Sequence, residues 1–225
     1  MGGVVLRAER GAIRELTAAF RPLRGEVRVL RGIDVSDWQS AVDWAARAGE
    51  GVAFGFARAS EGDAVTDRRF AGHWAAMREH GLVRGAYHVA RPDTDPAAQA
   101  RRFLGVVVAG GSAQGDLLAL VLDRARGVEP AGVSAFALEW CRAVERECGV
   151  RPFVHTFAAF AREGNCAGLG GHPLWISSPG RPQGDPEVPA PWREWRIHQY
   201  AHSPLDLNVF AGTRGDLTAL GLRHR

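Results

Sequence analysis

The sequence contains no lysine, because all 28 of its residues counted as lysine or arginine are arginine. A nucleic-acid-binding surface can enrich arginine but rarely excludes lysine, so genomic base composition is the favoured explanation. The formal net charge is only +3, and the arginines are scattered among acidic residues without a basic stripe of interleaved aromatics. We therefore expect no nucleic-acid partner.

Cysteine is also scarce, and its spacing predicts neither a disulfide framework nor a zinc site. Cys141 and Cys148 are seven residues apart in a predicted helix, about 10 Å along its axis, which is too far for a disulfide. Cys166 falls in a glycine-rich loop. Because no Cys-x-x-Cys pair or His–Cys cluster is present, we expect free thiols and no metal site.

Long apolar segments are missing too. No run of about 18 apolar residues exists, so we expect no membrane span. Residues 1–32 are interrupted by arginine every few positions and lack the apolar core of a secretory signal. We expect residues 1–26 to be an extension with a helix at 9–20, followed by a single domain at 27–225 and a monomeric protein.

Apolar, β-branched segments alternate with amphipathic ones along the rest of the chain. Strands are predicted at 27–35, 52–59, 83–90, 117–123, 151–157, 173–178, 195–200 and 205–210. Helices are predicted at 40–49, 67–80, 95–108 and 130–148. This alternation predicts an α/β fold with a parallel sheet. The first strand is followed by DVSDWQ, which has no glycine for a phosphate loop, so a closed barrel fits better than an open sheet.

Acidic residues recur at the ends of these predicted strands. Asp34 ends the first strand, Glu61 follows the second, Asp123 ends the fourth, and Asp206 begins the last. In a β/α barrel, the loops after the carboxyl ends of the strands form the face that carries the active site. Each acid alone could cap a helix, pair with an arginine or hold a turn, but together they favour one site.

Aromatic residues beside these polar positions favour a carbohydrate ligand, because aromatic faces stack on the C–H faces of sugars. The aromatic candidates are Trp38, Tyr87, Trp175, Tyr200 and Phe210. Three further tryptophans fall inside helical patterns and are assigned to the core, namely Trp44, Trp74 and Trp140.

Several segments together resemble the successive blocks of glycoside hydrolase family 25, the Chalaropsis-type lysozymes that cut peptidoglycan as N-acetylmuramidases. They are GIDVSDWQSAVDW, FARASEG, RGAYHVARP, LVLD, RPFVHTF, PLWIS and HQYAHSPLDLNVFAG, in order from about residue 31 to 213. The resemblance implies an irregular TIM-like β/α barrel of eight strands and about five helices, with an acidic groove across the strand ends. It also implies a peptidoglycan or related amino-sugar ligand and no cofactor.

Carried over by position, the resemblance implies catalytic roles for Asp34, Asp123 and Asp206. The substrate-binding candidates are Trp38, Glu61, Tyr87, Trp175, Gln199, Tyr200 and Asn208. The glutamate of the family's Asp-x-Glu motif, which is taken as the general acid, falls on Ala125 in this chain. His155 replaces what is commonly a tyrosine.

Alanine at the general-acid position decides the expected activity. Glycosidic oxygen is a poor leaving group, and its protonation by a positioned acid contributes about 10²–10⁴ in rate. Glu61 or Glu129 could reach the site through a water as a substitute, but the neighbouring Arg124 and Arg126 would keep a carboxylic acid ionised. We therefore predict a weak or inactive muramidase.

Two alternatives stay open at this point. One is a non-catalytic glycan-binding pseudoenzyme that retains the groove. The other is a different barrel hydrolase in which His88 or His155 acts as acid–base. The family resemblance favours a location at the cell wall, whereas residues 1–32 show no export signal.

Overall fold

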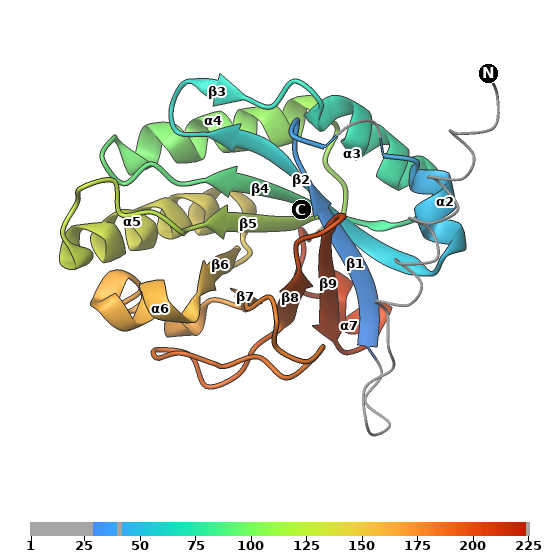
Figure 1. The fold of residues 1–225 in the computed structure, drawn as a ribbon. Coiled ribbons are helices and arrows are strands. Elements are labelled where there is room, and N and C mark those ends of the chain that lie inside the picture. Colours follow the sequence, from blue (N-terminus) through green and yellow to red (C-terminus); the bar gives the residue numbers. More distant parts are fainter. Residues whose placement is uncertain (1–28, 40–41, 224–225) are drawn as a thin grey trace, which may run out of the picture.

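The computed structural model describes residues 29–39 and 42–223 (Figure 1). The predictions of an extension at 1–26 and a helix at 9–20 lie outside the described residues. Nine strands form one sheet, and pairing of its first strand with its second closes all of them except the short β3 into an eight-stranded barrel. The barrel strands are β1 (Val29–Val35), β2 (Val52–Glu61), β4 (Val83–Val89), β5 (Leu117–Val121), β6 (Phe153–Phe157), β7 (Leu174–Ser177), β8 (Ile197–Ala201) and β9 (Asp206–Ala211). The predicted eight-stranded β/α barrel is therefore confirmed.

The barrel is parallel except at β9, which runs antiparallel to both β8 and β1. This reversal matters because β9 begins, rather than ends, at the rim formed by the carboxyl ends of the other strands. Its first residue, Asp206, is the register partner of Asp34 near the end of β1. The two aspartates therefore meet at one rim although they lie far apart in sequence.

Alternate residues of each strand point into the barrel or out toward the helices. The barrel interior holds an aromatic cluster that includes Phe54, Phe56, Phe153, Trp175 and Phe210. The outward residues pack against a second layer of helices, in which Trp44, Trp74 and Trp140 are buried as predicted.

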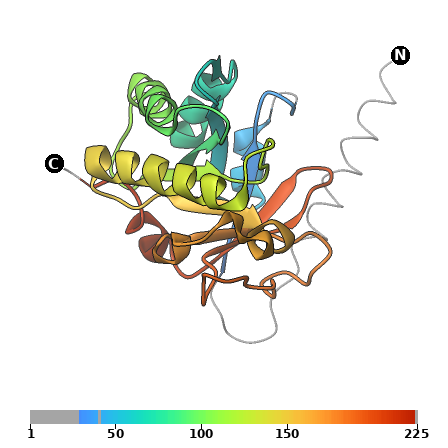
Figure 2. The same cartoon turned by 90° about the vertical axis from the view of Figure 1, so that its left-hand side faces the viewer.

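The helices cover the outside of the barrel (Figure 1). They are α2 (Trp44–Gly49), α3 (Phe70–Glu79), α4 (Pro96–Ala109), α5 (Pro130–Cys148) and α7 (Arg214–Thr218), with a short α6 (Ala158–Phe160) after β6. Figure 2 shows α4 and α5, which pack against each other, across one side of the strands. A two-residue strand, β3 (Val65–Thr66), pairs with the end of β2.

The helix boundaries follow local chemistry. Asp95 caps α4 by accepting the N–H of Ala97, with Pro96 in the first turn, as predicted. The helix predicted at 67–80 begins at Phe70, after a turn in which Asp67 Oδ1 accepts the backbone N–H of Arg69 at 2.8 Å. The other carboxylate oxygen of Asp67 accepts from Arg58 and from the backbone N–H of Asp37. None of the three cysteines forms a disulfide. Among the helices of residues 29–39 and 42–223, none is long and apolar enough to cross a membrane.

Candidate active site

The inward-facing polar residues of the barrel gather at the rim where the parallel strands end. Asp34 lies on β1, Gln199 on β8, and Asp206 and Asn208 on β9. Asp123 follows β5, two residues after the inward Val121, so strand alternation turns its side chain toward the same interior. The structure thus brings the three predicted catalytic aspartates to one end of the barrel.

Asp34 is held by two amide side chains. Its Oδ2 accepts hydrogen bonds from Asn208 Nδ2 at 2.7 Å and from Gln199 Nε2 at 3.1 Å. Trp175 Nε1 donates to Asn208 Oδ1 at 2.8 Å. Because an indole N–H can only donate, this contact fixes which end of the Asn208 amide faces Asp34. Asp34 is therefore oriented by residues from β7, β8 and β9.

The Asp34 carboxyl is only 8% exposed, and its surroundings favour the protonated form. Burial raises its pKa well above the usual value, and the negative charge of Asp206 raises the pKa further. The hydrogen bonds from Asn208 and Gln199 act in the opposite direction. Two carboxylates that face each other in a buried site resist carrying two charges at once.

His155 continues the same network from β6. Its Nε2 lies 3.0 Å from Gln199 Oε1, and its ring meets Trp175 edge-on with ring centroids 4.7 Å apart. Burial lowers the pKa of His155, while Gln199, Asp123 and Asp206 counteract that shift. Two buried acceptor atoms at this rim, His155 Nδ1 and Asp123 Oδ1, have no hydrogen-bond partner within the described chain.

Ala125 lies in the loop that follows β5, and its half-buried methyl group packs against the core between barrel and helices. The next residue, Arg126, has a positive φ of 54° and donates from Nε to Asp93 Oδ1 at 2.8 Å. This ion pair ties the loop to the one after β4. Residue 125, which the sequence analysis predicts as the general-acid position, therefore lies in a loop held by this ion pair and carries no proton donor.

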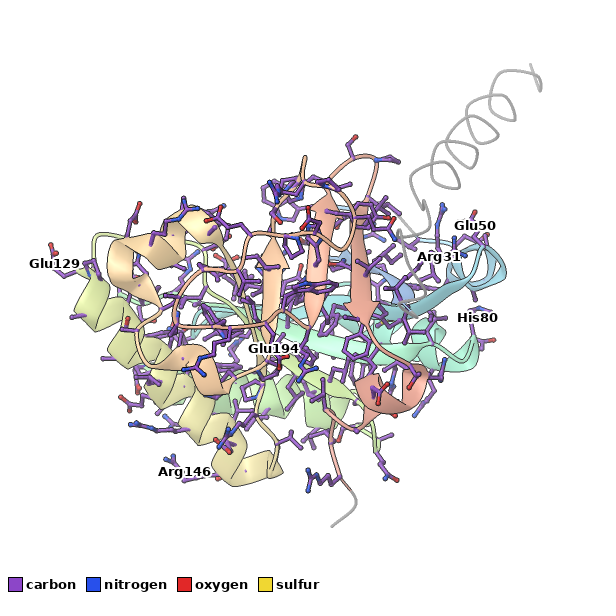
Figure 3. The ribbon with its side chains drawn as sticks, turned by 90° about the horizontal axis from the view of Figure 1, so that it is seen from below. Arg31, Glu50, His80, Glu129, Arg146 and Glu194 are labelled. Carbon is purple, nitrogen blue, oxygen red and sulfur yellow. The ribbon has the colours of Figure 1, made fainter. Side chains whose placement is uncertain are left out.

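Neither of the glutamates considered as substitutes is placed to take over. Glu61 is engaged by Arg91, with Nη2 and Oε1 2.7 Å apart, and by Arg58, with Nη1 and Oε2 3.6 Å apart. Glu129 is exposed just before α5 and points outward at the edge of the molecule (Figure 3).

Arg58 is the buried residue of this rim that the sequence reasoning missed. It donates from Nε to Asp67 at 2.8 Å and from Nη2 to Asp37. Its positive charge also acts on Tyr87, whose pKa is nevertheless raised by burial and by Asp34. The signal was present in VAFGFARA, where a charged residue interrupts an otherwise apolar strand at an inward position.

The predicted aromatic residues occupy three different environments. Trp38 is 85% exposed after β1, and Trp175 is buried to 1% exposure beneath the polar rim. Tyr87 lies edge-on to Trp175 with ring centroids 6.3 Å apart. Tyr200 points out of the barrel into the core under the helices, and Phe210 fills the barrel interior. Only Trp38 among these five presents an open ring face; Phe157, 37% exposed at the end of β6, was not anticipated.

His88 lies outside the barrel, away from the rim. It is fully buried, with Nδ1 2.8 Å from Ser60 Oγ and Nε2 2.9 Å from Gln99 Oε1, and its ring stacks on Trp140. Burial lowers its pKa to about 4. A role for His88 as an acid–base at the strand ends is therefore excluded by its position.

A cavity of about 780 Å³ lies at the opposite end of the barrel, where β6, β7 and β8 begin. Its lining includes Arg151, His172, Trp192 and Arg196 but none of the predicted site residues. In the part of the chain that the structure describes, no group of three or more His, Cys, Asp or Glu side chains is arranged to hold a metal ion.

Comparison with known proteins places the chain in a family. The family model for glycosyl hydrolases family 25 matches residues 33–207. The uncharacterized protein YegX of Escherichia coli (strain K12) is 32% identical over 217 residues, 89% of this chain and 78% of that protein. Lysozyme M1 of Streptomyces globisporus is 26% identical over 212 residues, 85% of this chain and 71% of that protein.

Solved structures agree with the fold. A family 25 lysozyme from Aspergillus fumigatus aligns with a TM-score of 0.79 at 23% identity, covering 87% of this chain and all of that one. A muramidase from Trichobolus zukalii aligns with a TM-score of 0.76 at 25% identity, covering 85% of this chain and 98% of that one. The match over residues 33–207 includes the Asp34 and Asp206 rim, and the chain therefore belongs to glycosyl hydrolase family 25.

Proposed function

We propose that this chain is a peptidoglycan-directed, lysozyme-like protein that binds glycan strands at the rim of Asp34, Asp123 and Asp206. We further propose that it cleaves them weakly or not at all. The observation that carries the proposal is the pairing of a retained aspartate rim with alanine at position 125. Two relatives whose names state an activity, Lysozyme M1 and the N,O-diacetylmuramidase of Arthroderma benhamiae, support the substrate class.

The retained half of the site suits recognition of an amino sugar. Asp123 Oδ1 is a buried acceptor without a partner, which the N–H of an acetamido group can satisfy. Asp206 supplies negative charge that would stabilise a positively charged transition state. Trp38 offers an exposed ring for stacking on a sugar face.

The missing half is protonation of the leaving group. Hydrolysis of a glycosidic bond needs an acid that delivers a proton as the bond breaks. Ala125 has no proton to give, Glu61 is held by Arg58 and Arg91, and Glu129 faces solvent. The second candidate function is therefore a glycan-binding protein without hydrolysis. The absence of an acid at residue 125 favours it.

The test compares the wild-type protein with Ala125→Glu and with Ala125→Gln, which has nearly the same shape but no acidic proton. Each protein is incubated with purified insoluble peptidoglycan, and bound protein and released reducing ends are measured in the same tube. We expect all three to bind and Ala125→Glu alone to gain hydrolysis, by about 10²–10⁴-fold. The melting temperature of each variant is recorded, because residue 125 packs against the core.

Two outcomes would contradict this proposal. Strong wild-type hydrolysis that Ala125→Glu leaves unchanged would show that another group already serves as the acid. Failure of the folded wild-type protein to bind peptidoglycan would remove the proposed ligand.

A further inference from the structure

We propose that His155 positions the bound glycan by accepting a hydrogen bond through Nδ1, and that protonation of the ring weakens glycan binding. The inference rests on the proposed function, because it names a contact and a regulation of the same site. It concerns His155, at a position where the family resemblance leads us to expect a tyrosine.

The tautomer of His155 is set by a chain of hydrogen bonds that starts at the indole N–H of Trp175, which can only donate. Trp175 Nε1 can only donate, so Asn208 accepts with Oδ1 and donates with Nδ2 to Asp34 Oδ2. Asp34 Oδ2 thereby serves as the acceptor at the centre of the network.

The Gln199 amide, the second donor to Asp34, fixes which nitrogen of His155 carries the proton. Gln199 donates with Nε2 to Asp34 Oδ2, which leaves its Oε1 as an acceptor facing His155 Nε2 at 3.0 Å. His155 Nε2 must therefore carry the proton. In a neutral imidazole the other nitrogen, Nδ1, is then a bare acceptor. This protonation pattern is assigned from the hydrogen-bond network.

The Nδ1 acceptor has no donor within the described residues, and the same is true of Asp123 Oδ1 at the end of the neighbouring strand. A buried polar atom without a partner costs about 1–3 kcal/mol, so such atoms in native proteins call for an explanation. A glycan carries hydroxyl and acetamido N–H donors, and one ligand of this kind can satisfy both acceptors.

The ring is also held rigidly enough to act as a positioning group. Trp175 meets it edge-on at an interplanar angle of 77°, and Gln199 fixes its other nitrogen. Rotation of the imidazole would break the Gln199 contact, so Nδ1 keeps one direction. A fixed acceptor selects the orientation of a sugar donor rather than only adding affinity.

Protonation of His155 turns Nδ1 from a hydrogen-bond acceptor into a donor, so it can no longer accept from the glycan. The charged groups that act on His155 are Asp123 at the end of β5, Asp206 at the start of β9 and His202 in the turn before β9. Burial outweighs the two carboxylates and lowers the pKa of His155 below 6.5, so the ring is neutral at pH 7. As the pH falls through that lowered pKa, Nδ1 gains a proton and changes from acceptor to donor.

The first experiment reads the tautomer directly in the wild-type protein. Long-range ¹H–¹⁵N spectra at pH 7 should show His155 protonated at Nε2 and bare at Nδ1. Addition of soluble, uncrosslinked peptidoglycan glycan strands should shift the Nδ1 resonance. A proton found on Nδ1 in the free protein, or an Nδ1 signal that saturating glycan does not move, overturns the inference.

The second experiment measures affinity for the same glycan strands between about pH 7.5 and pH 4.5. His155→Asn places an acceptor oxygen close to the position of Nδ1 but cannot titrate, and His155→Phe removes the acceptor. We expect wild-type affinity to fall about tenfold on the acid side, His155→Asn to remain flat, and His155→Phe to bind about three- to tenfold more weakly at pH 7.

His202→Asn separates the two histidines, since His202 Nδ1 contacts Asp206 Oδ1 at 2.7 Å in the same site. The inference is overturned if the fall in glycan affinity at low pH persists in His155→Asn or disappears in His202→Asn. In either case glycan binding itself still supports the proposed function. If wild-type protein binds no glycan at any pH, both the inference and the proposed function fail.

Discussion

Replacing Asp34 by Asn should stabilise the fold at neutral pH. The Asp34 carboxyl is 8% exposed and faces Asp206 across the β1–β9 pair. An asparagine can keep the acceptor oxygen where Asn208 and Gln199 donate, and it removes a buried negative charge beside Asp206. The substitution thus retains the hydrogen bonds and deletes the repulsion.

The raised pKa of Asp34 determines at which pH the substitution stabilises the protein. Burial and Asp206 raise the folded-state pKa of Asp34 above 3.8, so the ionised form destabilises the native state at neutral pH. That penalty is full above the raised pKa, declines as the pH falls through it, and is absent below about 3.8. Removing it should add about 1–2 kcal/mol at pH 7, which corresponds to about 2–8 °C in melting temperature for a domain of this size.

Urea unfolding at several pH values checks the prediction. The stability gap between Asp34→Asn and wild type should be largest near pH 7 and should close toward pH 3.8. Asp63→Asn, at an exposed turn, is the matched control and should change stability little at any pH. A variant that is less stable than wild type at pH 7 would refute the reasoning, because the amide network would then depend on the negative charge.

Two further predictions concern the barrel itself, and urea unfolding measures both. Arg84→Met should lower the free energy of unfolding by about 3–5 kcal/mol, because it leaves the buried Asp116 carboxylate, now 2.6 Å from Arg84 Nη2, without its ion-pair partner. Adding Asp116→Leu should restore most of that stability. Gly85→Ala should cost about 1–3 kcal/mol, since its Cβ would lie 2.2 Å from the Phe56 ring, whereas Gly105→Ala, with nothing within 4 Å, should not destabilise. Equal stability of Gly85→Ala and wild type would show that the Phe56 ring can move aside.

The barrel could be predicted from sequence because its signals are local. Strand segments such as 52–59 and 83–90 are nearly continuous in apolar character, and the helices between them begin and end at residues such as Asp95 and Gly149 that favour helix termini. Strand ends differ by only a few residues from the prediction.

The sidedness of individual residues was harder to predict. Gln199 and Tyr200 are adjacent on β8, so a strand must place them on opposite faces, yet both were proposed as groove residues. Gln199 faces Asp34, while Tyr200 packs under the helices. Which of the two points inward depends on the register with β7 and β9, and this register is not encoded in the segment itself.

The Arg58 cluster illustrates a different limit. Glu61 lies three residues after Arg58 on β2, but Asp37 and Asp67 come from other segments, and no local pattern indicates that these two meet Arg58. Asp67 was interpreted as the start of a helix, a role that its charge favours in isolation. In the structure Asp67 serves both ends: Oδ1 accepts the N–H of Arg69 just before α3, and Oδ2 accepts from the buried guanidinium of Arg58. Only the first of these contacts could be predicted from the local sequence.

The rim as a whole is rich in hydrogen-bond acceptors, and residue 125 adds no acid to it. Asp34, Asp123, Asp206 and the Nδ1 atom of His155 can all accept hydrogen bonds from a sugar, and the nearby glutamate is already held by two arginines. We expect such a surface to bind a ligand that carries many donors, as a glycan does. In our proposal, binding depends on these acceptor atoms, whereas the expected loss of cleavage follows from the methyl group at position 125.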